Sequence, residues 1–338
     1  MKKCIKVGII FLIFAFIAGC GKTTTLPKVD DEPDKKEEIV EKKVQIVDVN
    51  SNTRPIAVMI NNHNDARTVQ SSLQKAYIVY EIIVEGGITR YLALYKDVDE
   101  ATIGSVRSSR HYYLDYVLEN DAIYVHWGYS TQAKEDIATL GINNINGLVY
   151  EGSYFYRINN NAIAYEHRGF TTIDLLNKAI EKMKYRTTTD KGLLLQYSAE
   201  PVELNEASDA KNITIKYSNY ITDEYKYDEN SKSYLRRVNG SNHVDHETEK
   251  DIMVKNIIIY QLKNSTRVQD IKGRQDLDNI GSGSGYYVSE GKAVEINWTK
   301  KSRESKTTYT LKDSSPLVVN DGNTFIQIVP ETGNITVE

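Results

Sequence analysis

Two glutamates, two glycines and an arginine occur within the ten residues EIIVEGGITR at positions 81–90, inside an otherwise apolar run. On a β-strand, Glu81 and Glu85 would lie about 13 Å apart, because each residue advances the chain by about 3.3 Å. This is too far for the two carboxylates of a glycosidase that flank a single bond. A mechanism with one carboxylate, acting first as acid and then as base, is compatible with this stretch. Glu85 beside the glycines is the candidate for that role.

The glycine pair predicts a two-residue hairpin turn at 86–87. In that register Ile83 pairs with Arg90, so Arg90 joins Glu81 and Glu85 on one face, where long side chains meet diagonally. This charged face is either a solvated salt-bridge cluster, which contributes little stability, or the centre of a site. The opposite face is wholly apolar and is expected on the core; it consists of Ile78, Tyr80, Ile82 and Val84.

Further candidates follow in the next segments. Arg107 and Arg110 surround two serines at the start of a helix predicted over 108–119, where free N–H groups and guanidinium groups suit a carboxylate or phosphate. The alternative is a capped helix start with two surface arginines. His126 and Trp127 end a strand predicted over 121–127. His126 could be a general base or a satisfied buried residue, and Trp127 could stack on a sugar or belong to the core.

The remaining histidines and glycines give weaker signals. His167 lies between an acid and an arginine just before the second predicted helix, and we include it among the ligand-binding candidates. His243 and His246 are three residues apart but have no identified third ligand, so no metal is predicted. GSGSG at 281–285 is interpreted as a flexible turn. The chain has no P-loop, HExxH motif or GxSxG elbow, and no cofactor is predicted.

The elements that must position these residues indicate an α+β fold. The N-terminal domain, 51–190, is expected to hold a mixed or antiparallel sheet with a few helices; its predicted strands are 55–61, 76–85, 88–96, 121–127 and 147–158, and its helices 108–119 and 172–184. A connection spans 191–210. The smaller domain, 211–338, is expected to be mostly β, with strands at 212–217, 233–238, 252–262, 285–289, 293–299, 306–312 and 324–330.

The N-terminus predicts export and anchoring. Residues 1–20, MKKCIKVGIIFLIFAFIAGC, form a signal peptide whose end resembles a bacterial lipobox, with Cys20 as the lipidated residue. A plain signal peptide or a short anchor is the alternative. Residues 21–50 have the composition of a disordered tether. The only other cysteine is Cys4, so the folded part has no thiol, and disulfides and zinc thiolate sites are excluded.

Charge excludes one class of partner. The formal net charge is -4 over 338 residues and no basic stripe is present, so a main role in nucleic-acid binding is not expected.

Four motifs, RPIAVMINNHNDAR, YEIIVEGGITR, IGSVRSSRHYYLD and DAIYVHWGYS, followed by a β-rich part ending NTFIQIVP, resemble the YerB-like bacterial lipoproteins. The resemblance covers about residues 50 to 332, and the VEGGxTR stretch is the most specific part. It implies a two-domain, surface-anchored protein of a Gram-positive bacterium, in a family without an established activity. Charged residues at matching positions are Glu81, Glu85, Arg90, Arg107, Arg110, His126 and His167. The surroundings of His167 are less typical of the family.

Two functions are compatible with these features. The first is a lytic transglycosylase that cleaves peptidoglycan with Glu85 as acid and base and His126 as a further catalytic candidate. Glu81 and Arg90 would tune Glu85, and Arg107 and Arg110 would hold the anionic stem peptide or lactyl carboxylate of the substrate. The second is a non-catalytic lipoprotein that binds wall polymer or an envelope protein through the same residues. In both, the protein is extracytoplasmic and held at the outer face of the cell membrane by its lipid.

Overall fold

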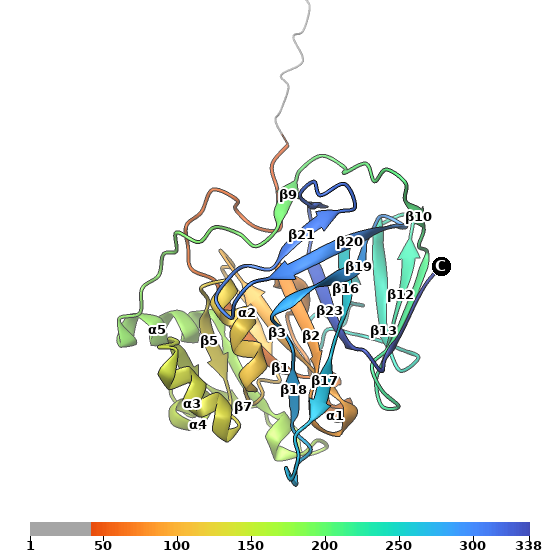
Figure 1. The fold of residues 1–338 in the computed structure, drawn as a ribbon. Coiled ribbons are helices and arrows are strands. Elements are labelled where there is room, and N and C mark those ends of the chain that lie inside the picture. Colours follow the sequence, from red (N-terminus) through yellow and green to blue (C-terminus); the bar gives the residue numbers. More distant parts are fainter. Residues whose placement is uncertain (1–41) are drawn as a thin grey trace, which may run out of the picture. The chain divides into compact units, whose positions relative to one another are not determined.

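The computed structural model describes residues 42–338, whose strands and helices are drawn in Figure 1. The predicted signal peptide, Cys20 and most of the predicted tether lie outside the described residues. In the first half of the described chain the strands are β1 Ile56–Asn61, β2 Ile78–Ile83, β3 Thr89–Tyr95, β4 Thr102–Gly104, β5 Ile123–His126, β6 Asn144–Asn146, β7 Tyr156–Arg157 and β8 Gly169–Thr172. The helices are α1 Asn64–Arg67, α2 Leu114–Glu119, α3 Thr131–Thr139, α4 Gly147–Tyr150 and α5 Ile173–Met183, with 3-10 turns η1 Leu73–Lys75, η2 Glu85–Gly87, η3 His111–Tyr113 and η4 Tyr165–His167.

The second half consists of strands. They are β9 Gln196–Ser198, β10 Ser208–Asp209, β11 Asn212–Lys216, β12 Thr222–Asp228, β13 Ser233–Val238, β14 Ser241–Asn242, β15 Met253–Val254, β16 Asn256–Leu262, β17 Asn264–Thr266, β18 Gln275–Leu277, β19 Gly281–Ser289, β20 Lys292–Lys300, β21 Thr308–Leu311, β22 Val318–Asn320, β23 Thr324–Pro330 and β24 Asn334–Val337. Few helices and many strands in mixed and antiparallel sheets confirm the predicted α+β class. None of the described helices is long and apolar enough to cross a membrane.

One sheet of eleven strands runs through both halves. Its order is β10-β20-β19-β16-β23-β2-β3-β1-β5-β6, with β21 paired to β20. In Figure 1 the orange strands of the first half therefore continue into the blue strands of the second. The junction is the parallel pair of β2 and β23, in which Glu81 lies opposite Gln327. The two predicted domains share this sheet.

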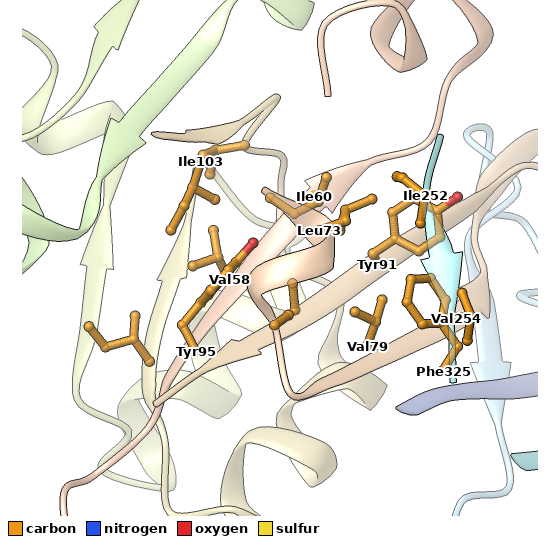
Figure 2. Close-up of a cluster of buried hydrophobic side chains, with 14 of the residues drawn as sticks. Val58, Ile60, Leu73, Val79, Tyr91, Tyr95, Ile103, Ile252, Val254 and Phe325 are labelled. Carbon is orange, nitrogen blue, oxygen red and sulfur yellow. The ribbon is translucent and has the colours of Figure 1, made fainter. Parts of the chain in front are cut away.

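Both faces of the large sheet are covered. Tyr113, Tyr116 and Ile137, from η3, α2 and α3, pack on one face. Helix α5 and the second sheet, ordered β14-β13-β12-β11-β24 with β15 beside β13, pack on the other. Figure 2 shows part of this second core, where Val79 and Tyr91 of the large sheet meet Val254 of β15. All six residues of β2 are buried, so the acid-bearing face of the hairpin is not a solvated surface.

The predicted hairpin register is wrong by one residue. Val84 donates its N–H to the Ile88 carbonyl at 2.7 Å, which leaves a three-residue loop. Gly86 and Gly87 both have positive φ, a left-handed backbone that glycine adopts at little cost. Ile82, not Ile83, therefore lies opposite Arg90.

Three other local predictions differ from the structure. The helix predicted over 108–119 begins only at η3 and α2, and neither serine caps it. The strand predicted over 147–158 is wrong except for β7 near its end, because the Asn146 side chain accepts from the Leu148 N–H at 3.0 Å and starts the short helix α4. GSGSG is the start of strand β19 and not a turn.

Candidate functional site

Glu81 belongs to a buried ionic network between the halves. Its carboxylate accepts hydrogen bonds from Thr89 Oγ1 at 2.6 Å and from Arg236 Nη2 at 2.7 Å. Arg236 also lies 2.7 Å from Asp223, and all three charged side chains are fully buried. Burial raises the pKa of Asp223 well above its usual range, and the charge of Arg236 opposes this effect. Glu81 is therefore a structural group that faces the second sheet.

Arg90 lies away from Glu81. The one-residue register difference places it opposite Ile82, on the face that packs against η3 and α2. Its Nη1 donates to the Ser108 carbonyl at 2.6 Å, and its Nη2 lies 3.6 Å from Glu85. The predicted single-face cluster of two glutamates and Arg90 is therefore wrong.

Glu85 is held by two arginines. Arg110 donates from Nη2 to Oε2 at 3.0 Å and from Nε to Oε1, and Arg90 lies next to Oε2. The Glu85 side chain is 17% exposed. Burial raises the pKa of Glu85, but the hydrogen bonds and charges of Arg110 and Arg90 outweigh it, so the pKa lies below its usual value. The carboxylate is ionised at neutral pH.

His126 has no free ring nitrogen. Nδ1 lies 2.8 Å from the Gly128 carbonyl and Nε2 lies 3.1 Å from Asn144 Oδ1. Burial lowers the pKa of His126 to about 4 despite these hydrogen bonds. The imidazole is neutral, fully buried and engaged with protein groups on both sides.

Trp127 is packed inside the protein. A Cβ on Gly147 or Gly169 would lie 2.5 Å or 2.6 Å from the nearest indole atom, so these glycines make room for the ring. Phe155 contacts it edge-on, with ring centroids 5.3 Å apart. The Arg157 guanidinium covers it at 4.3 Å. The indole is thus a support for Arg157 rather than an open stacking surface.

Arg107 lies at a cavity of about 270 Å³, which we call the Arg107 cavity. The lining residues are Val106, Arg107, Ser108, Trp127, Gly128, Tyr129, Leu148, Arg157, Tyr165 and Glu166. Arg107 Nη1 donates to the Glu166 carbonyl at 3.2 Å, and among residues 42–338 no carboxylate forms an ion pair with it. Burial lowers the pKa of Arg107, with Glu166 opposing, yet a guanidinium stays charged in proteins.

The cavity also contains groups that the sequence did not indicate. Arg157 stacks on Tyr165 at 3.8 Å and pairs with Glu151 at 2.7 Å. Tyr165 is 60% exposed and Leu148 is 63% exposed. Arg157 lies inside the segment predicted as a strand, and no local pattern connects it with Arg107. The combination of two guanidinium groups and an exposed aromatic ring suits an anionic ligand with an apolar face.

The predicted site residues thus fall into separate groups. Glu85, Arg90 and Arg110 form one ion-paired group, and Arg107 and Trp127 reach the cavity. Glu81 and His126 lie in two different buried environments. His167 lies beside the cavity, where its Nδ1 is 2.8 Å from the Asn61 side-chain amide and its ring stacks on His63. Together with Asp65, these two histidines are the described residues whose side chains could hold a metal.

Comparison with known proteins places the chain in a family. Residues 44–186 match the N-terminal domain, and residues 213–326 the C-terminal domain, of a family described as protein of unknown function (DUF3048). A relative described as the putative lipoprotein YerB of Bacillus subtilis is 32% identical, over 98% of this chain and 96% of its own. The crystal structure of YerB from Bacillus subtilis matches with a TM-score of 0.71, over 84% of this chain and 94% of that one. The chain therefore belongs to the two-domain family of YerB-like proteins.

Proposed function

We propose that the protein is a non-catalytic, lipid-anchored binding protein that recognises an anionic polymer of the cell wall through the Arg107 cavity. The observation that supports this best is the contrast between two charged side chains. Glu85 is ion-paired with Arg110 and Arg90, whereas Arg107 has no carboxylate partner among the described residues. An unpaired cation beside an exposed aromatic ring is a group that an anionic ligand can satisfy.

The competing function is cleavage of peptidoglycan with Glu85 as acid and base. A general acid must carry a proton near neutral pH, which requires a raised pKa. The arginines lower the pKa of Glu85 instead, against the effect of burial. His126, the other candidate catalytic group, has both ring nitrogens engaged. These contacts favour binding over catalysis.

The ligand class follows from the lining of the cavity. Arg107 offers a guanidinium group, which binds carboxylates and phosphates in a bidentate way. Arg157 adds positive charge beside it, although its guanidinium is already engaged by Glu151 and by the Tyr165 carbonyl. Tyr165 adds an exposed ring against which a sugar or peptide group can pack. Peptidoglycan combines these features, because its sugars carry stem peptides with free carboxylates. An envelope protein with an acidic surface is the other ligand to be tested.

The anchor is part of the proposal. The N-terminal segment ends in a lipobox-like sequence at Cys20, and a relative 32% identical over 98% of this chain is described as a putative lipoprotein. A lipid on Cys20 would hold residues 42–338 at the outer face of the cell membrane, where wall polymer is within reach.

Sedimentation with the wall polymer tests the function. The lipoprotein, purified in detergent, is mixed with purified peptidoglycan and centrifuged, and the soluble products are analysed by mass spectrometry. Wild type is expected to sediment without releasing anhydromuropeptides. Arg107→Gln should bind about tenfold more weakly or worse, since a hydrogen bond to a charged group contributes about 1.5–3 kcal/mol. Arg237→Gln, on the second sheet, is the matched control and should bind as wild type does.

Three results would overturn the proposal. Release of anhydromuropeptides by wild type but not by Glu85→Gln would establish the catalytic function. Failure of wild type to sediment would remove peptidoglycan as the ligand and favour an envelope protein. Equal binding by wild type and Arg107→Gln would show that the ligand lies elsewhere.

A further inference from the structure

Two histidines and an aspartate from distant segments meet beside the large sheet. His63 follows β1 and caps α1, Asp65 lies in the first turn of α1, and His167 ends η4. One potential ligand atom from each residue lies within 4.8 Å of the other two. The imidazole rings of His63 and His167 are stacked, with centroids 4.7 Å apart and planes 17° from parallel.

The environment of His167 suits a metal ligand. This residue is 5% exposed, and Asn61 engages its Nδ1 at 2.8 Å, which leaves Nε2 for an ion. A neutral imidazole binds a metal ion through the ring nitrogen that carries no proton.

The other two groups are open to solvent. The His63 and Asp65 side chains are 43% and 53% exposed, so an ion can reach them directly. His63 Nδ1 accepts only a long hydrogen bond of 3.3 Å from the Asp65 N–H and lies 3.7 Å from Asp65 Oδ2. These weak polar contacts leave the His63 side chain without a strong hydrogen-bond partner, so its stacking on His167 is the main contact to adjust when an ion binds.

We propose that His63, Asp65 and His167 form a binding site for one divalent transition-metal ion, with zinc as the best match. Two imidazoles and one carboxylate are a donor set that zinc uses when it keeps a fourth position open. Donor distances of about 2.1 Å in a tetrahedral site require the three ligand atoms, now within 4.8 Å of one another, to draw together by up to about 1.4 Å. Binding at Nε2 puts the proton of His167 on Nδ1. The Asn61 amide must then turn its oxygen to this proton, as an outer-shell partner does, and give up the hydrogen bond that this oxygen accepts from the His63 N–H at 3.1 Å.

The histidine pair His243 and His246 does not offer the same chemistry. His243 is buried, with Nδ1 2.6 Å from Arg236 Nη1 and Nε2 against the Gln70 side chain. It has no nitrogen left for an ion. His246 is exposed and does not belong to the group of His63, Asp65 and His167, so it is the matched control for a histidine outside the site. The metal proposal stands independently of the ligand of the Arg107 cavity.

Zinc binding by the lipoprotein in detergent tests the site, with a purification tag that contains no histidine. Retained zinc is counted per chain after dialysis, and affinity is measured by competition with a chromogenic chelator. The variants are His63→Gln, Asp65→Asn and His167→Gln, with His246→Gln as control. The visible spectrum of the cobalt-substituted protein gives a second readout, because it reports the ligands directly.

One zinc per wild-type chain is expected. Each of the three variants should lose at least about 10–100-fold in affinity, since even the loss of an outer-shell partner costs that much. His63→Gln and Asp65→Asn alter exposed side chains, so their thermal unfolding without metal should match wild type, and they keep the test valid if His167→Gln folds poorly. The proposal is overturned if wild type retains no zinc, if both exposed variants keep wild-type affinity, or if His246→Gln loses as much as they do.

Discussion

Glu85 is a carboxylate whose charge is balanced inside the protein. Arg110 contacts both of its oxygens and Arg90 lies beside one of them. The tip of the hairpin is thereby tied to the segment before η3. This contact explains why an acidic residue follows an apolar strand here without being fully exposed to water. Its ion-pair partners are Arg90 and Arg110.

Glu85→Gln is expected to change how stability depends on pH. The folded-state pKa of Glu85 is depressed, so its ion pairs stabilise the fold above the usual value of 4.5 and are lost as the pH falls through the folded pKa. Wild type should therefore lose more free energy of unfolding than the variant as the pH falls from neutral to below the pKa of Glu85. Urea unfolding over this range measures the difference. Parallel pH profiles for the two proteins would contradict the assignment.

The sequence identifies single candidate site residues better than it identifies the residues that they contact. Glu85, Arg107 and Arg110 stand out locally, but the structure pairs Glu85 with Arg110 and places Arg107 at the cavity. Arg157 and Tyr165 are far from Arg107 in the sequence, and His63 is farther still from His167. Such residues come together only because β1, β4 and β8 pair with their neighbouring strands. No local sequence pattern indicates this pairing.

The turn η2 decides which side chains of the hairpin share a face. A two-residue and a three-residue turn are both compatible with a glycine pair, but they differ by one residue in register and so move Arg90 across the sheet. The three-residue turn is stabilised by the contact of Ser218 Oγ with the Gly87 carbonyl. That contact comes from the second half of the chain, which explains why the local sequence favoured the wrong register.

Gly86→Ala and Gly87→Ala test the turn as a matched pair. Both residues have positive φ. A left-handed backbone costs an alanine about 1–2 kcal/mol, and this cost is common to the two variants. A Cβ on Gly86 meets nothing within 4 Å, whereas one on Gly87 lies 3.1 Å from Ser218 Oγ and from the Tyr220 ring. Gly87→Ala should therefore lower the free energy of unfolding more than Gly86→Ala does. Equal losses in chemical denaturation would argue against the packing of this turn on the second half.

Long apolar segments are predicted well from the sequence and short ones poorly. Strands β1, β3, β16 and β23 are apolar runs that the pattern identifies, and α5 shows its apolar face at helical spacing. Segment 147–158 is apolar too, but an asparagine cap converts its start into α4. In GSGSG, strand pairing with β20 overrides the usual preference of glycine and serine for turns.

At the scale of the whole molecule, the two halves depend on each other. Strand β23, near the end of the chain, lies between β2 and β16 and pairs in parallel with both. The network of Glu81, Asp223 and Arg236 crosses between the large sheet and the second sheet. Composition and periodicity locate the two halves, but they do not reveal that a strand near the C-terminus returns to pair with the first half.

A chain that ends at residue 210 is expected not to fold. It lacks β23, so β2 has a free edge, and it lacks the second sheet, so Val79 and Tyr91 are exposed. Circular dichroism and amide proton dispersion in NMR spectra measure the outcome. A cooperative thermal transition in this fragment would contradict the shared-sheet account.

Arg236→Met should be strongly destabilising. It removes the cation from between two buried carboxyl groups. Breaking a buried ion pair in this way typically costs about 3–5 kcal/mol. Arg237→Met is the neighbouring control, because its side chain is 37% exposed and lies 3.9 Å from Glu224. In chemical denaturation, the free energies of unfolding of the two variants should differ by most of that range of about 3–5 kcal/mol. Similar stabilities would mean that the network does not join the halves.

The central claim is that Arg107 serves an anionic wall ligand and that Glu85 does not perform catalysis. The most direct measurement is the affinity for purified peptidoglycan of wild type, Arg107→Gln and Arg107→Lys, with the supernatant assayed for anhydromuropeptides. We predict binding without products, a loss of about tenfold or more for Arg107→Gln, and partial retention for Arg107→Lys, which keeps the charge but not the planar fork. Product release that depends on Glu85, or equal binding by all three proteins, would contradict the account.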